Sequence, residues 1–158
     1  MALSNINVTL GASANQTLGT AGSLGNAQIG RGSTVTSYED GAGAGAVNVP
    51  HVASYSVVNP TTTSIDLRAG SIKQPNGETA SFASIEYLEL RYISGTGIVT
   101  VGGTLPGVAG TLEQVGDTIV VHKPIAGITV TQTTADTLTL ASSSGTVVVD
   151  VTAFGRAP

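Results

Sequence analysis

Apolar and polar residues alternate with a period of two along most of the second half of the chain. Short runs of Val, Ile, Leu, Thr and Tyr succeed one another from Ile85 to Phe154, and Gly, Pro, Asp or Ser stands in nearly every gap. Runs of this kind, separated by turn residues, are typical of an all-β sandwich or barrel. No window shows a convincing helical period of 3.6 residues, so we expect an all-β fold.

The longest run, SFASIEYLELRYIS, predicts a strand with two distinct faces. Successive side chains of a strand point to opposite sides. Leu88, Leu90 and Tyr92 therefore share the face that we expect to meet the core. Ile85 and Tyr87 fall on the opposite, outward face. Tyr is a common anchor of protein interfaces, which makes Tyr87 a candidate contact residue.

The part of the chain from residue 51 to 158 is predicted to form one β-sandwich domain. It offers about eight strands at spacings near ten residues, which suits a two-sheet jelly roll or a related sandwich. Pro75-Asn76-Gly77 marks a tight turn between two of these strands. The predicted fold is thus an antiparallel, jelly-roll-like β-sandwich.

Residues 1–50 differ from the rest and are predicted to form an N-terminal arm with one or two strands. The segment NINVTL alternates as a strand does, but the residues after it are mostly Gly, Ala and Ser. Such a segment fills little core, because each Gly weakens regular structure by roughly 0.5–1 kcal/mol relative to Ala. It is either a surface loop or an extended arm that orders against a neighbouring subunit. In the second case, the expected interface residues are Ile6, Val8, Leu10, Leu18, Leu24 and Ile29, together with Tyr87.

The composition bears on how the surface is covered. Charged residues make up 10% of the chain, against about 25% in an ordinary soluble domain. Lysine occurs only at Lys73 and Lys123, although edge strands are usually guarded by Lys or Pro. The surface is either neutral and well hydrated or covered by copies of the same chain or by a larger lattice.

Candidate chemistry is sparse, and we predict neither catalysis nor a bound cofactor or metal. The chain has no Cys and two histidines, His51 and His122, which do not have zinc-ligand spacing. No G-x-S-x-G elbow occurs, and Gly41 to Gly45 lacks the Lys and helix of a phosphate loop. The Asp residues near strand ends are better explained as turn and cap acceptors.

Charge and hydropathy also limit the partners. The net charge is −4 and the four Arg residues are scattered, whereas phosphate-backbone binding needs clustered Lys and Arg. No apolar run is long enough to span a membrane. The first residues show no secretory leader. We therefore expect no direct nucleic-acid or membrane contact, and synthesis in a host cytoplasm.

The second half of the chain resembles small phage virion proteins that decorate or cement the head. The likeness lies in the phrases TVGGT, VGDTIVV and IAGITVTQTTADTLTLASSSGTVVVDV, in the closing FGRAP, and in the low charge and Gly/Ala-rich start. It covers roughly Ile85 to Pro158 and transfers no site residues. It implies a structural virion protein, often a homotrimer, that clamps the lattice of a major capsid protein.

Two other functions remain open at this point. The chain could be a binding module that recognises glycans or a cell surface through loops such as Gly102 to Gly110. It could also be a filament subunit that donates its N-terminal strand to the next sandwich. If the arm attaches the protein, deletion of residues 1–30 should abolish lattice binding while the sandwich still folds.

Overall fold

The computed structural model describes residues 6–17, 26–40, 46–123 and 125–158, which form strands and turns without any helix. An N-terminal group contains β1 (Ile6–Thr17), β2 (Asn26–Asp40) and β3 (Ala46–Val47). The remaining strands are β4 (Val49–Val58), β5 (Thr62–Asp66), β6 (Ile72–Lys73), β7 (Thr79–Ala80), β8 (Ser84–Ser94), β9 (Val99–Gly103), β10 (Gly110–Leu112), β11 (Thr118–His122), β12 (Ile128–Thr129), β13 (Thr137–Ser142) and β14 (Thr146–Arg156).

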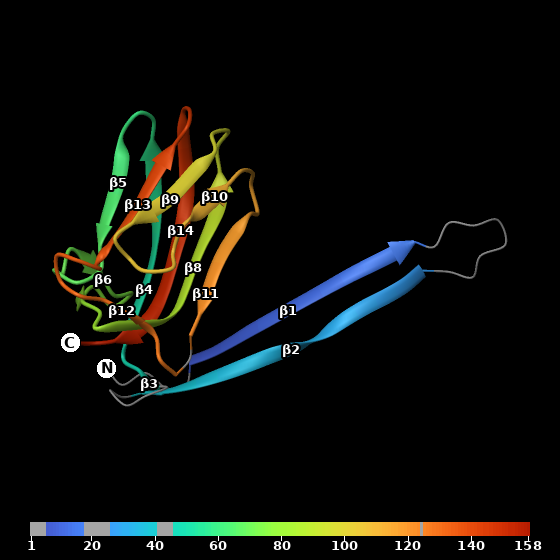
Figure 1. Ribbon diagram of the computed structural model, residues 1–158, viewed down its shortest axis with the longest axis horizontal. Helices are drawn as coiled ribbons and strands as arrows, with labels where there is room; N and C mark the ends of the chain where they lie inside the picture. The colour runs from blue at the N-terminus through green and yellow to red at the C-terminus, as the bar shows by residue number, and fades with distance from the viewer. Residues whose placement is uncertain (1–5, 18–25, 41–45, 124) are drawn as a thin grey trace.

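Two antiparallel sheets form the body of the molecule, as the ribbon in Figure 1 shows. One has the order β11-β8-β14-β4, with β12 also paired to β8, and the other has the order β10-β9-β13-β5. The pairs are nested, because β4 joins β14, β5 joins β13, β8 joins β11 and β9 joins β10. This nesting of eight strands over two sheets is the jelly-roll arrangement, so the fold prediction is confirmed.

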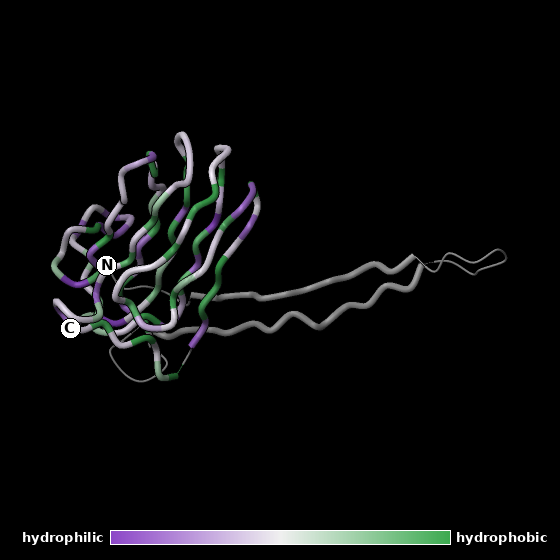
Figure 2. The backbone as a smooth tube through the Cα atoms, turned by 45° about the horizontal axis from the view of Figure 1, so that its top comes forward, coloured by the Kyte–Doolittle hydropathy of each residue, from purple (hydrophilic) through white to green (hydrophobic). Residues whose placement is uncertain are grey.

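The core lies between the two sheets and consists of aliphatic side chains with few aromatic ones. Leu88, Leu90 and Tyr92 are buried in it, as the alternation along β8 predicts. The Tyr92 hydroxyl donates a hydrogen bond to the Gly97 carbonyl at 2.8 Å, so its polar atom is satisfied inside the core. In Figure 2, hydrophobic stretches run along the strands of the sandwich.

A bulge in the pairing of β8 with β14 changes the face on which Ile85 lies. Phe154 pairs with Tyr87, but the next residue, Gly155, pairs with Ile85, so Glu86 is extra. A bulge of this kind breaks the alternation. Ile85 consequently joins the buried core, and the prediction that it shares the outward face with Tyr87 is wrong.

The Pro75–Gly77 turn connects β6 to β7, as predicted. The two strands pair through Ile72 with Ala80 and Lys73 with Thr79. Gly77 has a φ of 86°, a backbone conformation that side chains with a Cβ atom rarely adopt. The turn therefore depends on glycine at this position.

The hairpin of β1 and β2 extends away from the sandwich as a long two-stranded ribbon (Figure 1). Its antiparallel register runs from Ile6 opposite Tyr38 to Thr17 opposite Asn26, with one irregularity between Leu10 and Ala12. At its base, Glu39 and Asp40 pair in parallel with β3. We call β1 and β2 together the hairpin arm.

Candidate functional site

Four turns gather at one end of the sandwich, at the top of Figure 1. They connect β4 to β5, β8 to β9, β10 to β11 and β13 to β14. We call this surface the four-turn end, and it comprises residues 59–61, 95–98, 113–117 and 143–145 with the strand ends that flank them. The hairpin arm joins the sandwich at the opposite end, so the two features are well separated.

Hydrogen bonds link neighbouring turns of the four-turn end to one another. The Asn59 amide donates to the Gly145 carbonyl at 2.9 Å, and the Asn59 side chain donates to the Ser142 carbonyl at 2.8 Å. Ser143 and Ile98 exchange two further bonds, of 2.8 and 2.9 Å. A surface with such fixed turns loses little conformational entropy when it binds a partner.

Aliphatic side chains are exposed at this end. Val115 is 60% exposed, and Val58, Ile93 and Ile98 also reach solvent. Glu113 is the exposed charge of these turns. The Asp117 carboxylate accepts hydrogen bonds from the amides of residues 113 and 114 at 2.8 and 3.0 Å. The chemistry of this surface suits an uncharged, partly apolar protein partner better than an anion.

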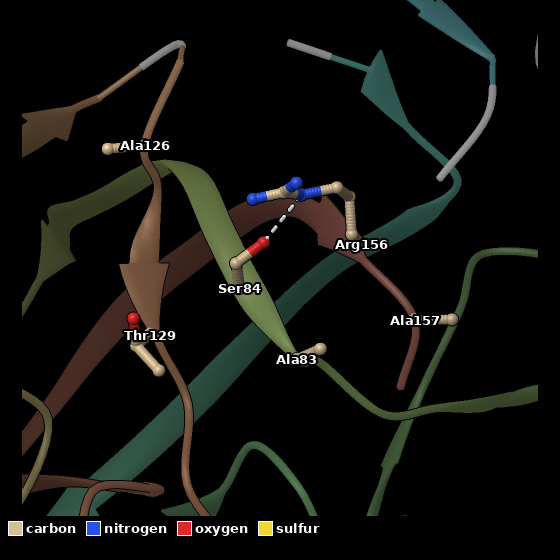
Figure 3. Close-up of a pocket in the computed structure, with 6 residues that line it drawn as sticks. All are labelled: Ala83, Ser84, Ala126, Thr129, Arg156 and Ala157. Atoms are coloured by element: carbon tan, nitrogen blue, oxygen red, sulfur yellow. Dashed lines mark hydrogen bonds between the residues drawn. The ribbon is translucent and has the colours of Figure 1, made fainter. Parts of the chain in front are cut away.

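A pocket of about 300 Å³ lies towards the other end, between the start of β8 and the C-terminal residues. Figure 3 shows the Arg156 side chain beside Ser84, with which it forms a hydrogen bond of 2.8 Å. The residues that line the pocket are Ala83, Ser84, Ala126, Thr129, Arg156 and Ala157. They include small side chains and one guanidinium group.

Glu86 lies next to this pocket and is completely buried. Its Oε1 accepts hydrogen bonds from Ser84 Oγ and Arg156 Nε, both at 2.7 Å. The loop after β11 covers it, because a Cβ atom at Gly127 would lie 2.8 Å from the same Oε1. Glu86 Oε2 has no hydrogen-bond partner among the described residues.

The Glu86–Arg156 pair has an evident structural role. It connects the end of β14 to the start of β8 at the bulge, where the regular pairing of the two strands is interrupted.

Sequence reasoning missed this pair. Glu86 on the core-facing side of an apolar strand was the available clue, but nothing in the sequence indicates that residue 156 is the partner. The pair neutralises its own charge, so it gives the pocket no strong preference for an ion.

Tyr87 lies on the face of β8 away from Leu88, as the alternation predicts, but it is only 6% exposed. Its ring stacks on Phe154 at a centroid distance of 5.8 Å and meets His122 edge-on at 6.0 Å. Its hydroxyl donates to a Glu89 carboxylate oxygen. The expectation of a solvent-exposed aromatic ring is therefore wrong, because residues of this chain already surround Tyr87.

The other expected interface residues belong to the arm. Ile6, Val8 and Leu10 lie on β1 and pair with residues 38, 36 and 34 of β2, and Ile29 of β2 pairs with residue 14. Leu18 and Leu24 lie outside the described residues. Their role in an interface stays a prediction, but the hairpin register brings those of β1 onto one continuous strand.

The two histidines lie in different surroundings. His51 is buried, with Nδ1 2.7 Å from the Lys73 carbonyl and Nε2 3.0 Å from the Tyr55 hydroxyl. Burial raises the pKa of Tyr55, which keeps this hydroxyl protonated as a donor. His122 lies on β11. Within the described part of the chain, no three His, Asp or Glu side chains form a group that could hold a metal ion.

The Gly102 to Gly110 segment is held by the core rather than projecting as an open loop. Leu105 and Val108 are buried among the core residues. The amides of residues 104 and 105 donate to the Thr137 carbonyl at 2.9 and 3.1 Å. These contacts anchor the segment at two side chains and two amides, while most of its other residues are exposed.

No helix that could cross a membrane occurs among the residues that the structure describes. Comparison with known proteins gives no match, either to a family model, to a curated protein or to a solved structure. Function must therefore be inferred from the geometry of this chain.

Proposed function

We propose that this protein is a structural component that assembles with copies of itself and decorates or stabilises the capsid lattice of a virus. The jelly-roll sandwich provides a rigid body, and the hairpin arm provides the attachment. The four-turn end then faces away from the attachment site. In this proposal the protein works on the virion as a closed oligomer, such as a homotrimer, bound to a major capsid protein.

The hairpin arm is the observation that carries this proposal. Its two strands pair at eleven register positions from Ile6↔Tyr38 to Thr17↔Asn26. The paired strands extend away from the sandwich (Figure 1). A two-stranded hairpin is marginally stable in water, and at least a third strand or a packed face is needed for independent stability. A partner that covers the arm provides both.

The low charge of the chain supports the same conclusion. Six Lys and Arg and ten Asp and Glu residues serve the whole chain of 158 residues, and β1 contains none of them. Isolated soluble domains usually carry interspersed charge on their surface. A charge-free strand is suited to burial in an interface. The jelly roll also occurs in viral capsid proteins, lectins and cupins, but a fold alone does not select a function.

The attachment role is tested by deletion of residues 1–40, which removes both strands of the arm. We expect the full chain to form a discrete oligomer and the truncated chain to be a monomer, because the interface is lost. Solution mass measurement distinguishes the two. Far-UV circular dichroism and denaturation should show that the truncated sandwich still folds, because the core cluster that the structure describes, from Val49 to Ala153, lies outside the deletion.

A matched control is Val115→Thr at the four-turn end, which should leave the oligomer unchanged. A full chain that stays monomeric at every concentration would refute self-assembly. If the truncated chain associated as strongly as the full chain, the role of the arm would be refuted. Long fibres in micrographs of the pure protein would indicate a filament subunit in place of a capsid component.

The capsid part of the proposal has a separate test. An antibody against the sandwich should label the surface of purified virus particles from the source of this sequence, and electron microscopy detects the label. Intact particles without label, in a preparation where the protein is expressed, would contradict a place on the virion.

A second candidate function is a binding module that recognises a cell surface through the four-turn end. The exposed Val115 and the hydrogen bonds between the turns favour it. The two functions differ in the effect of Val115→Asp. If the protein is a binding module, this change should weaken its binding to a cell surface. If it is a capsid component, the change should leave self-assembly intact.

A further inference from the structure

The edges of the two sheets differ in how well they are guarded. An edge strand presents unpaired N–H and C=O groups, which natural proteins protect with Pro, Lys, bulges or covering segments. Four strands, β11, β4, β10 and β5, occupy the ends of the two sheet orders. The strand with the weakest protection is the most suitable acceptor for a strand from another chain.

Within the described part of the chain, β11 lacks the sequence features that guard an edge, although its last residue, His122, already makes a contact of its own. Its five residues, Thr118–His122, include neither Pro nor a charged residue, and four of them are β-branched. None of the described strands pairs with its outer side. Val120, at the centre of the strand, is 39% exposed.

The phase of the ladder shows which backbone groups of β11 point outward. The Tyr92 amide donates to the Asp117 carbonyl at 3.0 Å, and the Lys123 amide donates to the Glu86 carbonyl at 2.8 Å. Antiparallel pairs alternate between hydrogen-bonded and non-hydrogen-bonded positions. The main-chain groups of Ile119 and Val121 therefore form hydrogen bonds with β8. The N–H and C=O of Val120 point in the opposite direction, towards the open edge of the sheet.

The β4 edge is better occupied. Pro50 has no amide to offer, the Ser56 carbonyl lies 3.5 Å from the Thr63 hydroxyl, and the Val58 carbonyl accepts the Thr61 amide at 2.7 Å. The β5 edge ends in a charged residue, Asp66, and β10 is only three residues long. This leaves β11 as the most accessible acceptor.

We propose that β11 of one copy receives β1 of a second copy, which extends the β11-β8-β14-β4 sheet by one strand. This inference rests on the proposed function and names the surface that the arm would occupy. The segment Ile6–Leu10 matches β11 in length, contains no charged residue and precedes the irregularity at Leu10/Ala12. β2 is the poorer donor because it contains Arg31, Glu39 and Asp40.

The contact is head-to-tail, because donor and acceptor are different surfaces of the same chain. Contacts of this kind either close into a ring or continue into a filament. Strand addition also obtains its affinity from main-chain hydrogen bonds, so a strand without charged residues, such as β1, is sufficient. The donated strand would pair with the outward backbone groups of Val120 at the centre of β11.

The substitution Val120→Pro tests this directly, because it removes an outward amide without breaking a hydrogen bond to β8. We expect the dissociation constant of the oligomer to rise by about tenfold or more, since several main-chain hydrogen bonds would be disturbed. Analytical ultracentrifugation of the full chain measures it. Denaturation curves for each variant report whether the sandwich is intact.

The matched control is Val52→Pro on β4. Val52 pairs with Thr152 at a non-hydrogen-bonded position, so its amide also points outward, and its side chain is 52% exposed. This change should leave the oligomer unaffected. The assignment of β11 would be overturned if both substitutions weakened the oligomer equally, or if neither weakened it.

Cross-linking provides a measurement that does not depend on how proline is tolerated. The chain has no Cys, so each introduced thiol is unique. A mixture of Val120→Cys and Val8→Cys chains should form a disulfide between copies under oxidation, and a mixture with Val52→Cys should not. If the donated strand is shifted by two residues, Leu10→Cys in place of Val8→Cys should form the disulfide with Val120→Cys.

The outcomes separate the two proposals. If deletion of residues 1–40 abolishes the oligomer but Val120→Pro and the cross-links have no effect, the arm attaches elsewhere and only this inference fails. If the deletion also has no effect, both the inference and the attachment role of the arm fail.

Discussion

Glu86 and Arg156 illustrate how a single buried pair can hold two strands together. The carboxylate is 0% exposed and the Arg156 side chain is 21% exposed, so water screens their attraction weakly. Loss of one partner leaves the other charge buried without compensation, which costs far more than replacing both by apolar groups. The pair is therefore a sensitive point in the sandwich.

We predict that Arg156→Ala lowers the free energy of unfolding by about 3–5 kcal/mol, because it leaves the buried Glu86 carboxylate without its charged partner. The double variant Arg156→Met with Glu86→Leu should recover most of this loss. Urea denaturation measures both. The control Arg91→Ala, at an exposed position on the same sheet, should change stability by about 0.5 kcal/mol or less. A similarly small effect of Arg156→Ala would show that the pair contributes little.

At the scale of elements, the bulge between β8 and β14 requires a residue without a side chain. A Cβ atom at Gly155 would lie 2.1 Å from the Ser84 carbonyl oxygen and 2.6 Å from the Phe82 ring. Backbone atoms cannot move aside as a flexible side chain does. The close approach of the two strands at this point, and with it the position of Arg156, depends on glycine.

We predict that Gly155→Ala destabilises the sandwich by about 1–3 kcal/mol through overpacking. Gly102→Ala is the matched control, because its Cβ would meet only Thr139 Oγ1, at an ordinary 3.5 Å. Thermal unfolding followed by calorimetry should show a lowered midpoint for the first variant and little change for the second. Equal midpoints would mean that the strands can separate at the bulge without cost.

At the scale of the whole molecule, the nested topology joins segments that are far apart in the sequence. β4 pairs with β14 from Val49↔Gly155 to Val58↔Thr146, so the long loop between them must close before these bonds form. Folding rates fall as such non-local contacts come to dominate. The hairpin arm contributes only local pairing and should have little influence on the rate.

We therefore predict that the sandwich folds in the range of milliseconds to seconds that is usual for β-sandwiches, and that deletion of residues 1–40 leaves this rate nearly unchanged. Stopped-flow refolding from urea measures both chains. A large decrease in rate after the deletion would show that the arm takes part in the rate-limiting step.

The alternation of apolar residues determined the fold class, the buried face of β8 through Leu88, Leu90 and Tyr92, and the Pro75–Gly77 turn, because these depend on local periodicity and turn chemistry. The sequence could not show that Ile85 changes face, that Tyr87 is enclosed by Phe154 and His122, or that Glu86 meets Arg156. Each of these depends on which strands become neighbours. The order of strands and the open β11 edge were likewise decided only by the tertiary structure, since the same alternation fits many strand orders and only the completed sheets fix which backbone groups remain unpaired.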